Sequence, residues 1–416
     1  MASTVAPPLP TDTVCTGVGA AAAYSLGNHK GRRTMEDLAL LTKFRQDLHR
    51  IPELDFDLPE TIAYVHGVLD GLSCEVTSPC RGCVAAFFDV DAKLGRPHGP
   101  ATAIRADMDA LPITERSGVS FCSTKPGHMH ACGHDGHMAM ALAAACWVNE
   151  VMAGDATEAA HLLPRNVLFV FQPAEETTGG ARLVCESGVF ERYGADRIFG
   201  FHVWPDLPAG TIASRPGPLL ARASETHLNV HGTSSHIAKS ADGHDALLAA
   251  AHFLTEVETL MARLSQDEPC LLKFGHMESG TVCNAISASS AVEGSLRVFS
   301  DNMFDRARTG VEQCAAQACE AYGCTYDLSF ATGYPPVDND RALYALAAGA
   351  LGDTLDGIEE PLLIAEDFAF YQRHLPGVFF LLGTGTSEPL HSNKFHMDEG
   401  VLVHGLAAYR MLLGIA

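Results

Sequence analysis

Short, almost wholly apolar segments alternate with helical patterns along most of this chain, and that alternation constrains its fold more than any other feature. Residues 166–171, 197–203 and 378–383 contain few polar side chains, which is typical of strands buried on both faces of a parallel sheet. Apolar residues at helical spacing predict helices between these strands, among them residues 59–72, 137–152 and 400–413. The sequence therefore predicts an α/β fold with a mixed, largely parallel sheet flanked by helices.

A second pattern interrupts the first. Between residues 223 and 331, polar and apolar residues alternate in the strand-like segments, as in antiparallel strands with one face in water. We therefore expect an inserted α+β domain at 223–331, within a catalytic domain formed by 38–222 and 332–416. Residues 1–37 are rich in Pro, Thr, Ala and Gly without a clear period, which predicts a poorly ordered extension.

Composition excludes several classes of protein. The 416 residues include 28 Lys and Arg against 50 Asp and Glu, a net charge of −22, which argues against a nucleic-acid partner. No apolar run reaches the roughly 20 residues that a membrane span needs. The N-terminus lacks the basic and apolar regions of a signal peptide. The 13 cysteines are an odd number, which favours free thiols and a cytoplasmic location.

Residues 129–137, Met-His-Ala-Cys-Gly-His-Asp-Gly-His, are the strongest local signal for chemistry. Cys132 and His134 are good ligands for a transition metal, and they can converge from a loop. The alternative is a glycine turn with incidental histidines. Four ligand-type side chains within a few positions favour the metal site.

Acids and histidines also follow four of the predicted strands. Glu175 and Glu176 follow one strand, Asp109 follows another, and His202 and His391 lie at or after two more. In open α/β sheets, ligands bind outside the carboxyl ends of the strands. The glutamate pair taken alone could equally be a solvated loop, but the agreement of four strand ends predicts a common site.

Several long motifs in this order resemble the M20 metallopeptidase superfamily. They are Leu-His-Arg-Ile-Pro-Glu-Leu at 48–54, Arg-Ala-Asp-Met-Asp-Ala-Leu-Pro at 105–112, the segment 130–137, Phe-Gln-Pro-Ala-Glu-Glu at 171–176 and Leu-His-Ser-Asn-Lys-Phe-His-Met-Asp-Glu at 390–399. The resemblance covers about residues 40–416. It is to the amidohydrolase branch, which contains hippurate hydrolases, N-acyl-amino-acid amidohydrolases and plant auxin-conjugate hydrolases. It implies a zinc-exopeptidase-like catalytic domain with an inserted lid domain.

The resemblance also implies roles for individual residues. Glu175 matches the general base, and Asp109 matches an acid that supports a metal-ligand histidine. In the lid, His236 matches a histidine that contacts substrate, often across a dimer, and Asn284 and Arg297 match positions that help to hold the substrate. The residues that match metal ligands are Cys132, His134, Glu176, His202 and His391.

Five protein ligands are more than one catalytic ion uses, because such an ion keeps about three and an open position. We therefore expect two divalent ions (Zn, Mn, Co or Ni) with a bridging water. Two anionic ligands and a bridging hydroxide leave a surplus positive charge, which favours an anionic substrate.

The expected reaction is hydrolysis of N-acyl amino acids by a metal-bound water, with Glu175 as base. The expected assembly is a homodimer through the lid. The alternatives are a dipeptidase or aminopeptidase on the same scaffold, and a non-catalytic metal-binding relative.

The sequence leaves the roles of some residues undecided. His231 and His244 compete with His236 for the role of the lid histidine. His137 either supports the site or begins a helix. The Cys-Arg-Gly-Cys segment at 80–83 is interpreted as structural or incidental thiols, because no second pair of this spacing exists.

Overall fold

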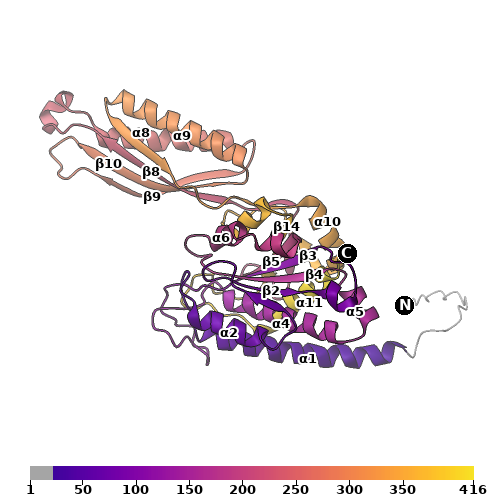
Figure 1. Cartoon of the computed structure of the whole chain (residues 1–416). Helices are drawn as coiled ribbons and strands as arrows, with labels where there is room; N and C mark the ends of the chain where they lie inside the picture. The colour runs from indigo at the N-terminus through magenta and orange to yellow at the C-terminus, as the bar shows by residue number, and fades with distance from the viewer. Residues whose placement is uncertain (1–21) are drawn as a thin grey trace, which may run out of the picture.

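The structure, a computed structural model, describes residues 22–416 and contains two bodies of different architecture (Figure 1). The larger body is built on an 8-stranded sheet of order β1-β2-β4-β3-β5-β14-β6-β13. Its strands are β1 Glu75–Thr77, β2 Val84–Phe88, β3 Ala101–Asp107, β4 Asn166–Gln172, β5 Ala195–Trp204, β6 Ile212–Ser214, β13 Leu355–Gly357 and β14 Gly377–Gly383. The central neighbours β4, β3, β5 and β14 run parallel. The predicted fold class is therefore confirmed.

Helices cover both faces of this sheet because alternate residues of a buried strand point to opposite faces. In β4, Val167, Phe169 and Phe171 join one core, whereas Leu168 and Val170 join another. The first core is covered by α1 Ala22–His49, α2 Pro59–Leu69, α4 His134–Ala153, α10 Arg341–Leu351 and α11 Leu402–Leu413. The second is covered by α6 Gly180–Glu186, α7 Val189–Tyr193 and the 3-10 helix η3 Asp367–Arg373. The short helices α3 Val90–Leu94 and α5 Ala156–Leu162 complete this body.

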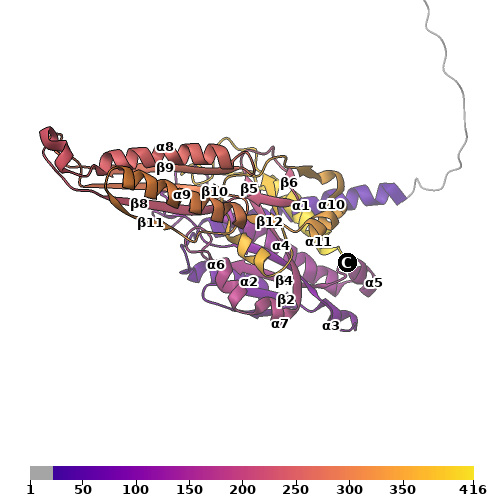
Figure 2. The ribbon, with the colours of Figure 1, turned by 90° about the horizontal axis from the view of Figure 1, so that it is seen from above.

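The smaller body, called the lid below, projects away from the first (Figures 1 and 2). Its antiparallel sheet has the order β11-β8-β10-β9, with β8 Arg222–His231, β9 Cys270–Ser279, β10 Ser289–Val298 and β11 Thr325–Phe330. The helices α8 Ala246–Leu264 and α9 Asp301–Ala321 lie side by side on one face (Figure 2). They bury a third core, separate from the other two. The paired strands β7 Gly217–Leu220 and β12 Val337–Asn339 lie next to the two points where the chain passes between the bodies.

The N-terminal prediction needs a correction. Residues 22–37, expected to lack order, belong to α1. The charges explain part of the difference, since Asp37 accepts two hydrogen bonds from the Arg410 guanidinium of α11 at 2.6 and 2.7 Å. Residues 1–21 of the expected extension lie outside the described residues. Within residues 22–416, no helix has the length and apolar character of a membrane span.

Candidate metal centre

The site forms where the parallel strands β3, β4, β5 and β14 end, since their carboxyl ends meet at one edge of the sheet. His202 lies near the end of β5, and Glu175 and Glu176 follow β4. Cys132 precedes α4, and His134 is the first residue of that helix. His391 comes from the loop after β14. Segments far apart in the sequence therefore supply the site.

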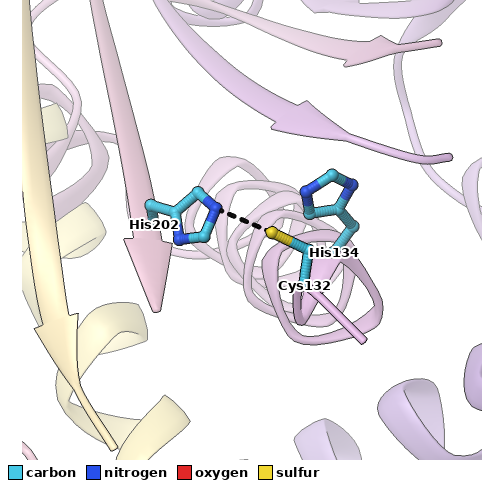
Figure 3. A group of neighbouring side chains, drawn as sticks. All are labelled: Cys132, His134 and His202. Atoms are coloured by element: carbon cyan, nitrogen blue, oxygen red, sulfur yellow. Dashed lines mark hydrogen bonds between the residues drawn. The ribbon is translucent and has the colours of Figure 1, made fainter. Parts of the chain in front are cut away.

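All five predicted metal ligands come together. The Cys132 Sγ lies 3.3 Å from the His202 Nε2, as the dashed line in Figure 3 shows. The Glu176 Oε1 lies 3.7 Å from the His134 Nε2 and 3.4 Å from the His391 Nε2. The donor atoms of Cys132, His134 and His202 lie within 4.8 Å of one another, and so do those of Cys132, Glu176 and His391. Cys132 belongs to both groups, so the two groups are neighbours with one residue in common.

Backbone carbonyls set the orientation of the two buried imidazoles. The His134 Nδ1 lies 2.8 Å from the Asp109 carbonyl oxygen, and the His202 Nδ1 lies 2.7 Å from the Val203 carbonyl oxygen. A carbonyl can only accept, so each Nδ1 carries the proton and each Nε2 offers its lone pair to the site. Burial lowers the pKa of His134, and it lowers that of His202 to about 3. Both rings are therefore neutral, as metal ligands must be.

Two buried atoms at the centre have no hydrogen-bond partner, the His134 Nε2 and the Glu176 Oε1. Burial, with the charges of Glu176 and Glu175, also raises the pKa of the Cys132 thiol. Unsatisfied buried polar atoms are costly, and a divalent cation would satisfy these and favour the thiolate. The combination of sulfur, imidazole and carboxylate donors suits a transition metal.

Asp109 supports the site differently from the expectation. Its carbonyl oxygen, and not its carboxylate, makes the close contact with His134, because the Asp109 Oδ1 lies 3.8 Å from the His134 Nδ1. The carboxylate instead accepts the backbone N–H groups of Glu175 and Glu176 at 2.9 and 3.0 Å. Asp109 therefore fixes the glutamate loop and orients His134 at the same time.

His137 supports the site and does not merely begin a helix. Its Nε2 accepts the Val203 N–H at 2.9 Å, so its protonated Nδ1 donates to the Asp107 Oδ1 at 2.6 Å. Asp107 also accepts from the buried Arg105 at 2.7 Å. Through His137, this chain of contacts joins the end of β3 to the end of β5, which contains His202. The sequence signal was the position of Asp107 at a strand end, but its partner could not be identified from it.

A cavity of about 610 Å³ opens beside the ligands. Arg297, which the resemblance places among the residues that help to hold the substrate, lines it from β10 of the lid. It also contains residues that the sequence did not single out, namely Trp204, Tyr334, Leu363, Ile364 and Glu366. The acid pair at 366–367 was a signal of the same kind as 175–176. The Tyr334 hydroxyl donates to the Glu175 carbonyl oxygen at 2.8 Å.

His236 and Asn284 do not line this cavity. They lie together in the lid, where the Ile237 N–H donates to the Asn284 carbonyl oxygen at 3.0 Å. The exposed His236 ring accepts the Ala238 N–H at 3.1 Å. The competing lid histidines are exposed as well: His231 contacts the Asp327 carboxylate at 2.9 Å, and His244 contacts a backbone carbonyl.

Comparison with known proteins gives a consistent picture. The family model described as Peptidase family M20/M25/M40 matches residues 103–414. An N-acetyldiaminopimelate deacetylase of Streptococcus uberis is 33% identical over 382 residues, which cover 90% of this chain and 98% of the relative. The deacetylase of the same name from Shouchella clausii is 32% identical over 377 residues, 89% of this chain and 97% of the relative. The crystal structure of the Bacillus subtilis YXEP protein, titled a dinuclear metal binding peptidase, is 30% identical with a TM-score of 0.77 and covers 92% of this chain and 99% of that one.

Proposed function

This chain belongs to peptidase family M20/M25/M40, and from that premise we propose that it is a binuclear metal amidohydrolase whose substrates are N-acyl amino acids. One observation carries the proposal. The five ligand-type side chains come together beside Glu175, and two of their buried atoms have no hydrogen-bond partner. The resemblance seen in the sequence motifs is confirmed by the family match.

We propose that two divalent ions occupy the two donor groups that share Cys132, with zinc, manganese, cobalt and nickel as the candidates. Such a pair lowers the pKa of a bound water and polarises the substrate carbonyl. The ligand set and the base are intact, which argues against a non-catalytic relative. The cysteines within residues 22–416 are all free, which supports a location in the reducing cytoplasm.

Glu175 takes the proton of the attacking water and returns it to the leaving nitrogen. Its side chain is 7% exposed. Burial, followed by the charges of Glu366 and Glu176, raises the pKa of Glu175 well above its ordinary value. A raised pKa suits a carboxylate that must hold a proton during the reaction. The contacts of its backbone with Asp109 and Tyr334 keep it in place.

The cavity supports an acyl amino acid with a free carboxylate. Arg297 is half-buried, and burial lowers its pKa, so an anion beside it would compensate its charge. The apolar side chains of Trp204, Leu363 and Ile364 offer a wall for the acyl group. His236 lies on the lid outside this cavity, and we propose that it serves the site of a second copy in a homodimer.

A substrate panel tests this assignment. Protein reconstituted with each of the four metals is assayed on N-acetyl and N-benzoyl amino acids, on the same compounds with the carboxylate converted to an amide, and on free dipeptides. We expect turnover of the acyl amino acids, with a marked loss when the carboxylate is masked. A preference for free dipeptides would instead favour the peptidase alternative.

The Glu175→Gln variant tests the role of the base. General acid–base catalysis contributes about 10²–10⁴-fold, so we expect kcat to fall by that order while the metal content, measured by mass spectrometry, stays unchanged. The matched control is Glu176→Gln, which should lose metal as well as activity. Unchanged turnover in Glu175→Gln would remove this residue from the mechanism.

A further inference from the structure

The turn between β1 and β2 contains two thiols, Cys80 and Cys83, that the proposed reaction does not use. The Cys83 N–H donates to the Cys80 carbonyl oxygen at 3.2 Å, and Gly82 has a φ of 76°. This is a four-residue β-turn with its third residue in the left-handed region, which glycine favours. The first and fourth Cα atoms of such a turn lie within about 7 Å, close to the span that a disulfide bridges.

The two thiols differ in their surroundings. Cys83 is 1% exposed and belongs to the core under α6 and η3, whereas Cys80 is partly exposed at the edge of that core. The neighbouring Cys83 lowers the pKa of the Cys80 thiol, while burial raises the pKa of the Cys83 thiol. Cys80 is therefore the more exposed and more reactive thiol, and Cys83, at the other end of the same turn, is the thiol placed to attack it next.

The turn also packs against the loop that carries the catalytic glutamates. A Cβ atom on Gly82 would lie 3.0 Å from the Pro173 Cβ. Val84, directly after Cys83, pairs with Phe171 of β4. Pro173 is followed by Ala174, a non-glycine residue with a φ of 56°, and then by Glu175. A change in the turn therefore reaches the base through one layer of contacts.

We propose that Cys80 and Cys83 are an oxidation site that a hydroperoxide converts into an intramolecular disulfide, and that this disulfide lowers activity by displacing the glutamate loop. The Cys80 thiolate attacks the peroxide, whose O–O bond breaks to give a sulfenic acid and water or an alcohol. The Cys83 sulfur then attacks the Cys80 sulfur and the S–O bond breaks, and the leaving hydroxide takes the Cys83 proton and departs as water. The two thiols lose two electrons and two protons in total, and the peroxide is reduced.

Peptide mapping without reductant tests the site independently of any activity. Trypsin cleaves after Arg81, between the two cysteines, so the disulfide would join peptides 51–81 and 82–93. Peptide 51–81 also contains Cys74, and the Cys74→Ser variant removes that ambiguity. After treatment of the metal-loaded full chain with hydrogen peroxide, we expect the joined pair, lighter by two hydrogens than the separate peptides. It should be absent from Cys80→Ser and Cys83→Ala. Its absence from both the wild type and Cys74→Ser would overturn the site.

The coupling to the glutamate loop rests on the proposed function and is tested by kinetics. A displacement of a catalytic group by about 1 Å can cost a hundredfold in rate, so we expect kcat to fall roughly tenfold on oxidation and to recover with dithiothreitol. Cys80→Ser should keep its basal activity and resist the peroxide, whereas a Ser substitution of the exposed Cys122 should behave as wild type. Equal inhibition of Cys80→Ser, or a joined pair without loss of activity, would overturn the coupling.

Discussion

Gly133 lies between the two proposed metal ligands Cys132 and His134, and its backbone conformation is a requirement of the site. Its φ is 85°, and a Cβ atom there would lie 2.4 Å from the Val203 Cγ2. The site also contains Ala174 and His391 with φ values of 56° and 64°, a conformation that costs energy for residues with a side chain. Backbone strain is therefore concentrated where the ligands converge.

The Gly133→Ala variant separates this contact from the general cost of the left-handed region. Gly127 has a φ of 79°, but a Cβ atom there would meet no other atom within 4 Å, so Gly127→Ala is the matched control. Both variants should lose about 1–2 kcal/mol of unfolding free energy. Gly133→Ala should lose about 1–3 kcal/mol more from the clash and also bind metal more weakly. Urea unfolding and metal analysis measure the two effects, and equal behaviour of the variants would contradict the argument.

At the residue scale, the sequence pattern identifies the side chains that come together at the centre better than it identifies the residues that support them. Cys132 and His134 are close in the chain, and His202 lies near the end of a recognisable strand, so local pattern is enough for them. The two roles of Asp109 depend on which of its oxygens faces which neighbour, and no pattern of residue types contains that information. The cavity residues Tyr334 and Ile364 come from segments without any strand or motif signal.

At the scale of elements, α1 is joined to the start of α4 by buried charges. His49 contacts Asp135 at 2.8 Å and Glu115 at 3.1 Å. Arg45 donates to the same Asp135 carboxylate at 3.2 Å. Burial opposes the charge on His49, but the hydrogen bond and charge of Asp135 outweigh it and raise the pKa of His49 to about 9. His49 is therefore charged in the folded protein at neutral pH.

This raised pKa predicts a pH dependence of stability. Below pH 6.5, His49 is protonated in both the folded and the unfolded chain, so its full contribution to the free energy of unfolding is present. Between pH 6.5 and about 9 only the folded chain keeps the proton, and the contribution is lost as the pH rises. At about 1.4 kcal/mol per unit of pKa, the loss is roughly 3 kcal/mol at most. Urea unfolding of wild type against His49→Gln measures it, with the exposed His98→Gln as control. A difference that does not shrink with rising pH would contradict the prediction.

Helix boundaries show where sequence patterns fall short at this scale. The apolar period of the sequence predicts a helix near residues 305–322, but α9 begins at Asp301, because the Ser300 hydroxyl caps it by accepting the Met303 N–H at 3.0 Å. The helix predicted from residue 137 begins at His134. In both cases the first turn contains polar residues that cap the helix or face the metal centre, and such residues do not follow the apolar period.

At the scale of the whole molecule, the metal centre belongs to one body and the lid has its own core. The donor residues of the centre lie around the large sheet, whereas the third core contains lid residues alone. The inserted α+β domain was predictable because its strands alternate in polarity. The position of this domain relative to the site was not predictable, because the few contacts between the two bodies produce no recognisable pattern in the sequence.

Removal of the metal should therefore act on the two bodies differently. A ligand at about 1,000 times its Kd stabilises the folded state by about 4 kcal/mol, and a loss of that size lowers a domain's Tm by on the order of 10 °C. We expect chelation to lower the unfolding temperature of the larger body, measured by calorimetry, and to leave that of the lid unchanged. Addition of manganese should restore the original value. An equal shift of the whole profile would show that the bodies unfold as one.

The position of β14 has a consequence for how the protein is made. This strand fills the interior of the large sheet between β5 and β6, yet it is encoded after the whole lid. On the ribosome, the growing polypeptide exposes the edge of β5 until β14 has been translated, and His391 emerges later still. The complete set of proposed ligands is therefore available only after His391 has been made, and a product that ends before β14 retains an open sheet edge of the kind that nucleates aggregation.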